Sequence, residues 1–155
     1  MEKVTLPIQY TNTLMYEFEK AFYDERGKGA RFRLTTVGRS FYESNLRDRI
    51  CQNDMGHILE VVGKTLKELG IISEIEFGTE DRLLRIKMQG CLHRPVEEKM
   101  IENGAEPFAC IPANLIVLAI EEKLNRPVEI AEIKLSEAGC QILLVIFGQQ
   151  PIIQE

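Results

Sequence analysis

The 155-residue sequence contains no tryptophan and only two histidines. Without tryptophan, no indole is available as a stacking surface for a base or a sugar. No serine or cysteine stands in a known nucleophile motif, and His57 and His93 are the only side chains that ordinarily titrate near neutral pH. The net charge is −5, and basic residues mostly stand beside acidic ones. We therefore expect neither nucleic-acid binding nor enzymatic catalysis, and we predict no catalytic residues.

Long hydrophobic runs are also missing. The longest, residues 142–147, has the length of a strand, whereas a membrane helix needs about 20 apolar residues. The first ten residues include Glu2 and Lys3 and carry no signal-peptide core. Four cysteines are present, none in a closely spaced pair, and reduced thiols are the default for such a chain. We expect a cytoplasmic protein with no membrane span.

The first 70 residues favour three helices. Thr11, Asn12 and Thr13 offer N-caps for a helix that ends at residues 27–29, and a second helix is expected from Thr35 or Thr36 to about residue 52. Asp54 caps the third, and a glycine at position 70 suits its C-terminal end. The third helix has a regular apolar stripe, formed by Met55, Ile58, Leu59, Val62, Leu66 and Leu69.

After residue 70, the apolar residues recur at every second position instead of at helical spacing. Residues 74–88 predict a β-hairpin with its turn at 78–81, and residues 128–147 predict a second hairpin. The last strand, 140–147, is apolar on both sides, which is typical of a central strand covered on both faces. Residues 112–124 predict a helix that is apolar over most of its girth and therefore deeply buried. The expected fold is α+β: one domain over 1–155, mainly helical to residue 70, then a four-stranded antiparallel sheet with helices packed on it.

Residues 108–147 resemble the 4-vinyl reductase domain family, which includes proteins described as hydrocarbon-binding. The family shares its fold with TRAPP-type vesicle-tethering subunits and heme–nitric-oxide sensors. Its pattern is a cysteine before a long apolar helix, a strand with an acid, and a glycine-plus-cysteine turn into the last strand. These parts correspond here to Phe108-Ala109-Cys110, 112–124, 128–134, Gly139-Cys140 and 142–147. The family often has a second cysteine near the end of the third strand, where this chain has Leu135 or Ser136.

The resemblance implies a sensory or accessory module that holds an apolar or tetrapyrrole-like ligand between helices and sheet. Arg33, close in sequence to Arg31, Arg39 and Lys28, could receive an acidic head group, although a solvated basic face is the other interpretation. The resemblance also implies a homodimer, which the first two helices could form. The predicted ligand-binding residues are mostly apolar: Phe108, Leu115, Leu118, Leu144, Phe41 and Arg33.

The same apolar residues could instead fill a core. An interior packed tightly, with Leu118 and Leu144 in van der Waals contact, would leave a sensory role without support. It would favour the alternative function, a protein-interaction subunit of the TRAPP type with a filled core.

A metal-binding protein is the third hypothesis. Cys91, His93, Cys110 and Cys140 are soft or borderline ligands, and zinc is the metal they suggest. Cys110 stands where the buried helix begins, and a helix N-terminus favours the thiolate, so it is expected to be the most reactive. The alternative is that all four are simply buried.

Overall fold

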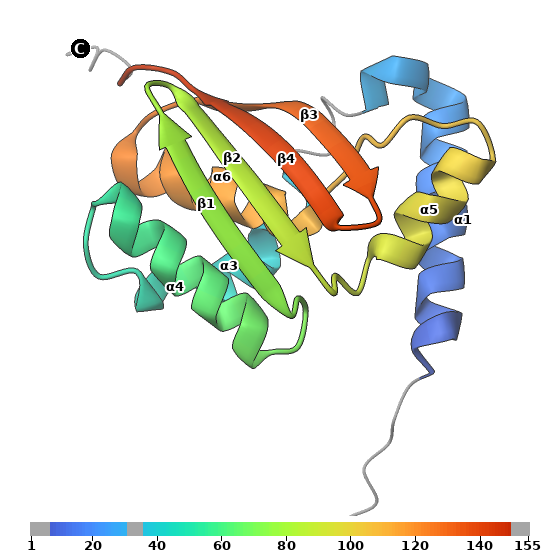
Figure 1. Ribbon diagram of the computed structural model, residues 1–155, viewed down its shortest axis with the longest axis horizontal. Helices are drawn as coiled ribbons and strands as arrows, with labels where there is room; N and C mark the ends of the chain where they lie inside the picture. Colours follow the sequence, from blue (N-terminus) through green and yellow to red (C-terminus); the bar gives the residue numbers. More distant parts are fainter. Residues whose placement is uncertain (1–6, 31–35, 150–155) are drawn as a thin grey trace, which may run out of the picture.

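The computed structural model describes residues 7–30 and 36–149. In this part of the chain, helices cover one face of a four-stranded antiparallel sheet, which confirms the predicted α+β class (Figure 1). The strand order is β1-β2-β4-β3. The α-helices are α1 (Ile8–Arg26), α3 (Arg39–Asn45), α4 (Met55–Glu68), α5 (Arg94–Glu102) and α6 (Ile111–Leu124). The strands are β1 (Glu74–Glu80), β2 (Leu83–Gln89), β3 (Val128–Ser136) and β4 (Gly139–Ile146). Two short 3₁₀ turns are η1 (Gly27–Gly29) and η2 (Arg47–Arg49).

Two of the predicted helices begin elsewhere than expected. α1 begins at Ile8 rather than after Thr13, because Pro7 serves as its N-cap and its carbonyl accepts from the amide of Tyr10. α3 begins only at Arg39, because Gly38 adopts a left-handed conformation with φ of 104°. A helix cannot run through that residue.

The start and end of α4 follow the sequence pattern. The Asp54 side chain accepts from the amide of His57, as expected of an N-cap, and Gly70 has φ of 70° just beyond the helix.

The first hairpin turns two residues later than predicted. β1 continues to Glu80, and the turn consists of Asp81 and Arg82, with Asp81 at φ 52°. A two-residue turn of this kind matches the twist of the paired strands, so the strands extend as far as the turn allows. Glu76 pairs with Lys87 across the hairpin, as the charge pattern predicted.

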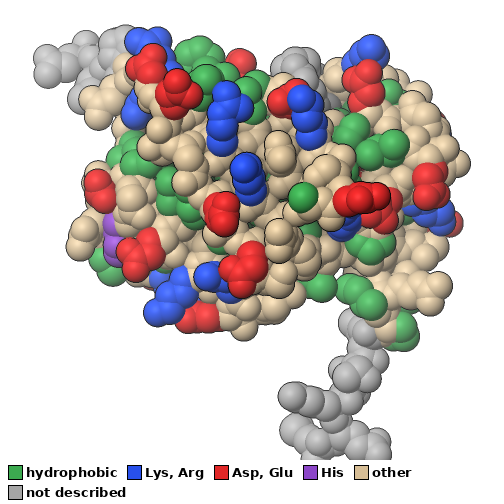
Figure 2. All heavy atoms as spheres, viewed as in Figure 1, with side chains coloured by type: hydrophobic (Ala, Val, Ile, Leu, Met, Phe, Trp, Pro, Cys, Tyr) green, Lys and Arg blue, Asp and Glu red, His purple; other side chains and the backbone are tan. Residues whose placement is uncertain are grey.

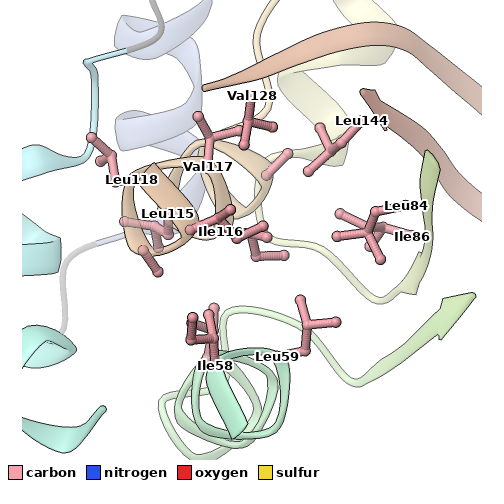
Figure 3. Close-up of a cluster of buried hydrophobic side chains, with 14 of the residues drawn as sticks. Ile58, Leu59, Leu84, Ile86, Leu115, Ile116, Val117, Leu118, Val128 and Leu144 are labelled. Carbon is pink, nitrogen blue, oxygen red and sulfur yellow. The ribbon is translucent and has the colours of Figure 1, made fainter. Parts of the chain in front are cut away.

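The main core is built around α6. Every residue of this helix from Pro112 to Ile120 is buried. The strands lie on one side of the helix, α4 lies beside it against the same face of the sheet, and α3 packs on it as well (Figures 1 and 3). Gly63 of α4 allows this layer to close, because a Cβ atom there would lie 3.1 Å from the Ile75 side chain.

Within residues 7–30 and 36–149, no helix covers the other face of the sheet, which corrects the expectation that β4 is covered on both faces. β4 is central, as predicted, but Leu143 and Val145 are only partly buried on the open face. They lie beside charged residues of neighbouring strands, among them Arg85 and Glu129. The aliphatic stems of such residues can shield apolar neighbours while their charges stay in water. Figure 2 shows charges of both signs spread over this side.

No helix within the described ranges is both long enough and apolar enough to cross a bilayer.

The packing around α6 predicts a large stability cost for truncating Leu144, which is fully buried. Leu144→Ala should lower the free energy of unfolding by about 2–5 kcal/mol, measured by urea denaturation. Gln141→Ala, at an exposed position of the same strand, should change it by no more than about 0.5 kcal/mol. Equal effects of the two substitutions would contradict this assignment of the core.

Candidate functional site

An apolar groove of about 550 Å³ runs beside α1. This helix packs against α5 at the side of the sheet, and none of its residues is buried (Figure 1). The opposite wall comes from the segment before α3 and from the start of α6. Nearly all of the lining is apolar; the residues are Thr11, Leu14, Met15, Phe18, Glu19, Phe22, Val37, Ala109 and Ile111.

A second and much smaller pocket lies where α5 and α6 begin. Its volume is about 20 Å³, which is room for a single water molecule. All four predicted metal ligands line it, so we call it the thiol pocket: Cys91, His93, Cys110 and Cys140, with Glu97. The sheet register brings Cys140 opposite Met88, three residues before Cys91. The chain therefore gathers three thiols from three separate segments.

Burial keeps these thiols protonated. It raises the pKa of Cys91 and Cys140, and it raises the pKa of Cys110 well above its usual value. A hydrogen bond from the Ala113 amide lowers the Cys110 pKa, as a helix N-terminus should, but desolvation is the larger effect. The expectation that Cys110 would be the most thiolate-like cysteine is therefore wrong. Burial likewise lowers the pKa of His93, which favours its neutral form, and its Nδ1 atom has no hydrogen-bond partner in the described part of the chain.

A pair of carboxyl groups lies between the two pockets. Glu19 of α1 lines the groove, Glu97 of α5 lines the thiol pocket, and their side chains are hydrogen-bonded to each other. Burial raises the pKa of Glu19 to about 7. Burial and the neighbouring Glu19 charge raise the pKa of Glu97 to about 9. At neutral pH Glu97 is thus a neutral acid that donates to Glu19, although these values belong to the pair as a unit.

No described cation forms an ion pair with either carboxyl group. Lys20 pairs with Asp24, and Arg94 pairs with Glu98. Lys99 lies over the ring of Tyr16, 4.4 Å from its centre. Apart from the facing carboxyl group, the buried Oε2 atom of each glutamate has no hydrogen-bond partner among the described residues. Such atoms cost free energy unless a ligand or an ion satisfies them.

The predicted ligand-binding residues do not line the groove. Leu115, Leu118 and Leu144 are buried in the main core, and Phe41 packs against it. Leu118 lies on the side of α6 away from the strands, whereas Leu144 lies on the strand side (Figure 3). Phe108 belongs to a smaller core between α1 and α5, where its ring meets Tyr23 at 5.5 Å. Arg33 lies outside the described residues.

The metal prediction stays a prediction. Cys91, His93, Cys110 and Cys140 share one pocket, but no group of three or more Cys, His, Asp or Glu side chains in the described chain is placed to hold a metal ion.

Sequence reasoning missed Glu19 and Glu97, although a signal was present. Glu19 stands four residues after Met15 and three before Phe22, within the apolar side of α1. Glu97 stands beside Val96 and three residues before Met100, both of which are buried. An acid inside an apolar helical stripe is the pattern that could have identified the pair.

The difference in burial among the cysteines predicts two classes of thiol. Cys51 is exposed and should react rapidly with a thiol reagent such as 5,5′-dithiobis(2-nitrobenzoic acid) at pH 8. Cys91 and Cys110, which are partly buried, and Cys140, which is buried, should react much more slowly in the folded protein than after unfolding. Cys51→Ser should abolish the fast phase. Rapid labelling of Cys110 in the folded chain would contradict this.

The carboxyl pair predicts that stability falls as pH rises. Both folded-state pKa values lie above the usual 4.5, so the folded protein binds more protons than the unfolded chain between these values. The stabilisation is complete below about 4.5 and is lost as pH rises through about 7 and 9. Urea denaturation at pH 5, 7 and 9 should show a smaller decline for Glu97→Gln than for the wild type. Glu102→Gln, an exposed change on the same helix, should keep the wild-type decline; the same decline in all three proteins would argue against the pair.

Comparisons of the chain with protein families, with curated proteins and with solved structures found no match.

Proposed function

We propose that the protein is an accessory or sensory module that binds a small apolar molecule in the groove beside α1. The observation that carries this proposal is the groove itself. A volume of about 550 Å³ falls within the range of small-molecule sites, and the lining is apolar apart from Thr11 and Glu19. Apolar walls around a few polar groups are the usual composition of such a site.

The position of the groove differs from the expected one. The residues predicted to line a cavity between helices and sheet are used for packing, and Leu144 is fully buried there. Phe18, in contrast, has 77% of its surface exposed although it lines the groove. A bound molecule would cover apolar surface that the described chain leaves in contact with water, which is favourable.

A second function, protein interaction through α1, is favoured by the exposed side of this helix. Ile8, Tyr10, Leu14 and Phe18 are all exposed on α1, and the interior around α6 is filled. Adjacent exposed apolar side chains often mark an interaction surface. A homodimer formed through α1 would be the simplest case.

A neutral apolar probe distinguishes the two functions. The alcohol 4-phenylbutanol should bind the full chain and raise its melting temperature in proportion to its occupancy. Phe18→Ala should weaken this binding by about tenfold, equivalent to about 1.4 kcal/mol, because the ligand loses an aromatic contact. Isothermal titration calorimetry measures the affinity.

Tyr10→Ala is the matched control. Tyr10 is another exposed aromatic residue of α1, but it does not line the groove, so its removal should leave the affinity unchanged. Absence of binding, together with a dimer that both substitutions dissociate in light scattering, would reject ligand binding in favour of protein interaction.

A further inference from the structure

We propose that the groove selects apolar molecules that end in a protonated amine, which the Glu19 carboxylate receives. This inference rests on the proposed function, because it concerns the head group of the molecule that the groove would hold. It differs from the acidic head group that Arg33 was predicted to receive.

The chemistry of the groove supports an amine. Among the described residues that line the groove, Glu19 is the only ionisable one, and no described cation pairs with it; Glu97 is the one group that its carboxyl bonds. An ionised carboxylate in apolar surroundings is unfavourable unless a donor or a positive charge lies beside it. A ligand ammonium supplies both, and a charge-assisted hydrogen bond is stronger than one from a neutral alcohol.

Glu97 positions the acceptor. Its carboxyl group is 7% exposed and holds a proton at neutral pH, so it donates to Glu19 rather than repelling it. Donation to one carboxylate oxygen of Glu19 leaves the other for the ligand. Glu97 touches no ligand in this arrangement and acts only through Glu19.

No charged or titratable neighbour in the described chain takes the place of the ligand ammonium beside Glu19. On the α5 side, Glu97 faces the thiols of Cys91, Cys110 and Cys140, which burial keeps neutral. His93 is partly buried, with its pKa lowered, and the cations near the pair on α1 and α5 have partners of their own: Lys20 with Asp24, Arg94 with Glu98, and Lys99 over Tyr16.

Binding of the amine releases a proton in a pH-dependent amount. The ammonium keeps its own proton, and the carboxyl group of Glu19 loses its proton to the buffer as the ion pair forms. With a Glu19 pKa of about 7, release should be about 0.9 proton per ligand at pH 6, about 0.5 at pH 7 and about 0.1 at pH 8. A primary alkylamine stays protonated throughout this range.

The test uses three probes with one apolar body: 4-phenylbutylamine, 4-phenylbutanol and 4-phenylbutyrate. Calorimetry at pH 6, 7 and 8, in buffers of different ionisation enthalpy, gives both the affinity and the number of protons released. The amine should bind at least about tenfold more tightly than the alcohol at pH 8 and should release protons as calculated. The alcohol should release none.

Glu19→Gln should remove the preference for the amine and the proton release while keeping the affinity for the alcohol. Glu17→Gln is the matched control, since Glu17 is exposed on α1 and outside the groove. The proton count of the wild type tests the proposal even if Glu19→Gln does not fold.

The failures of the two proposals are distinguishable. An alcohol that binds as tightly as the amine overturns the assignment of the head group and leaves the proposed function intact. A preference for 4-phenylbutyrate overturns the assignment of an amine head group and favours the sequence-based prediction that Arg33 receives an acidic one. Absence of binding by all three probes overturns both proposals.

Discussion

The structure depends on covering α6 on all sides. Because nine consecutive residues of this helix are buried, it needs the sheet, α3 and α4 packed around it. A helix without a polar side cannot lie at the surface. Gly38 lies so close to Leu115 of α6 that a Cβ atom there would lie 3.1 Å from its side chain, and Gly63 lets α4 approach Ile75 of the sheet equally closely. The side chains that cover α6 fill the centre of the fold, where the predicted ligand would have been bound.

The covering of α6 also explains where the groove lies. α1 takes no part in the main core and is attached through α5 and a small cluster that includes Ala30, Met100 and Phe108. One side of α1 is therefore free of the packing that fills the interior. The groove forms where this side faces Ile111 and Val37, at the edge of the core. A helix without a buried residue, rather than the most buried helix, therefore lines the groove.

The fold was largely predictable because its signals are local. The stripe of α4, the Asp54 cap and the alternation of β2 each depend on residues a few positions apart, and all three appear in the structure. The start of α3 was missed because the conformation of Gly38 depends on contact with Leu115, far along the chain. Burial of the thiols depends on three segments meeting, so the protonation of Cys110 could not be inferred from its position at a helix end.

The candidate site was less predictable, because core and ligand residues have the same composition. Leu144 and Phe18 are both large and apolar, and only the three-dimensional structure shows that one is enclosed and the other exposed. Glu19 and Glu97 could have been identified as acids in apolar stripes, but their meeting across α1 and α5 is a tertiary contact.

The carboxyl pair is the feature that packing alone does not explain. Other buried polar side chains in the described chain have partners: Thr65 accepts from Arg49, and Asn114 donates to the carbonyl of Val37. Glu97 is buried as well, yet its carboxyl group faces only another acid, Glu19, and no described cation or amide donor satisfies either Oε2 atom. A leucine or methionine at position 97 would extend the surrounding apolar cluster at no such cost. Departures of this kind from stable packing are expected at functional sites, where they are retained for what they bind.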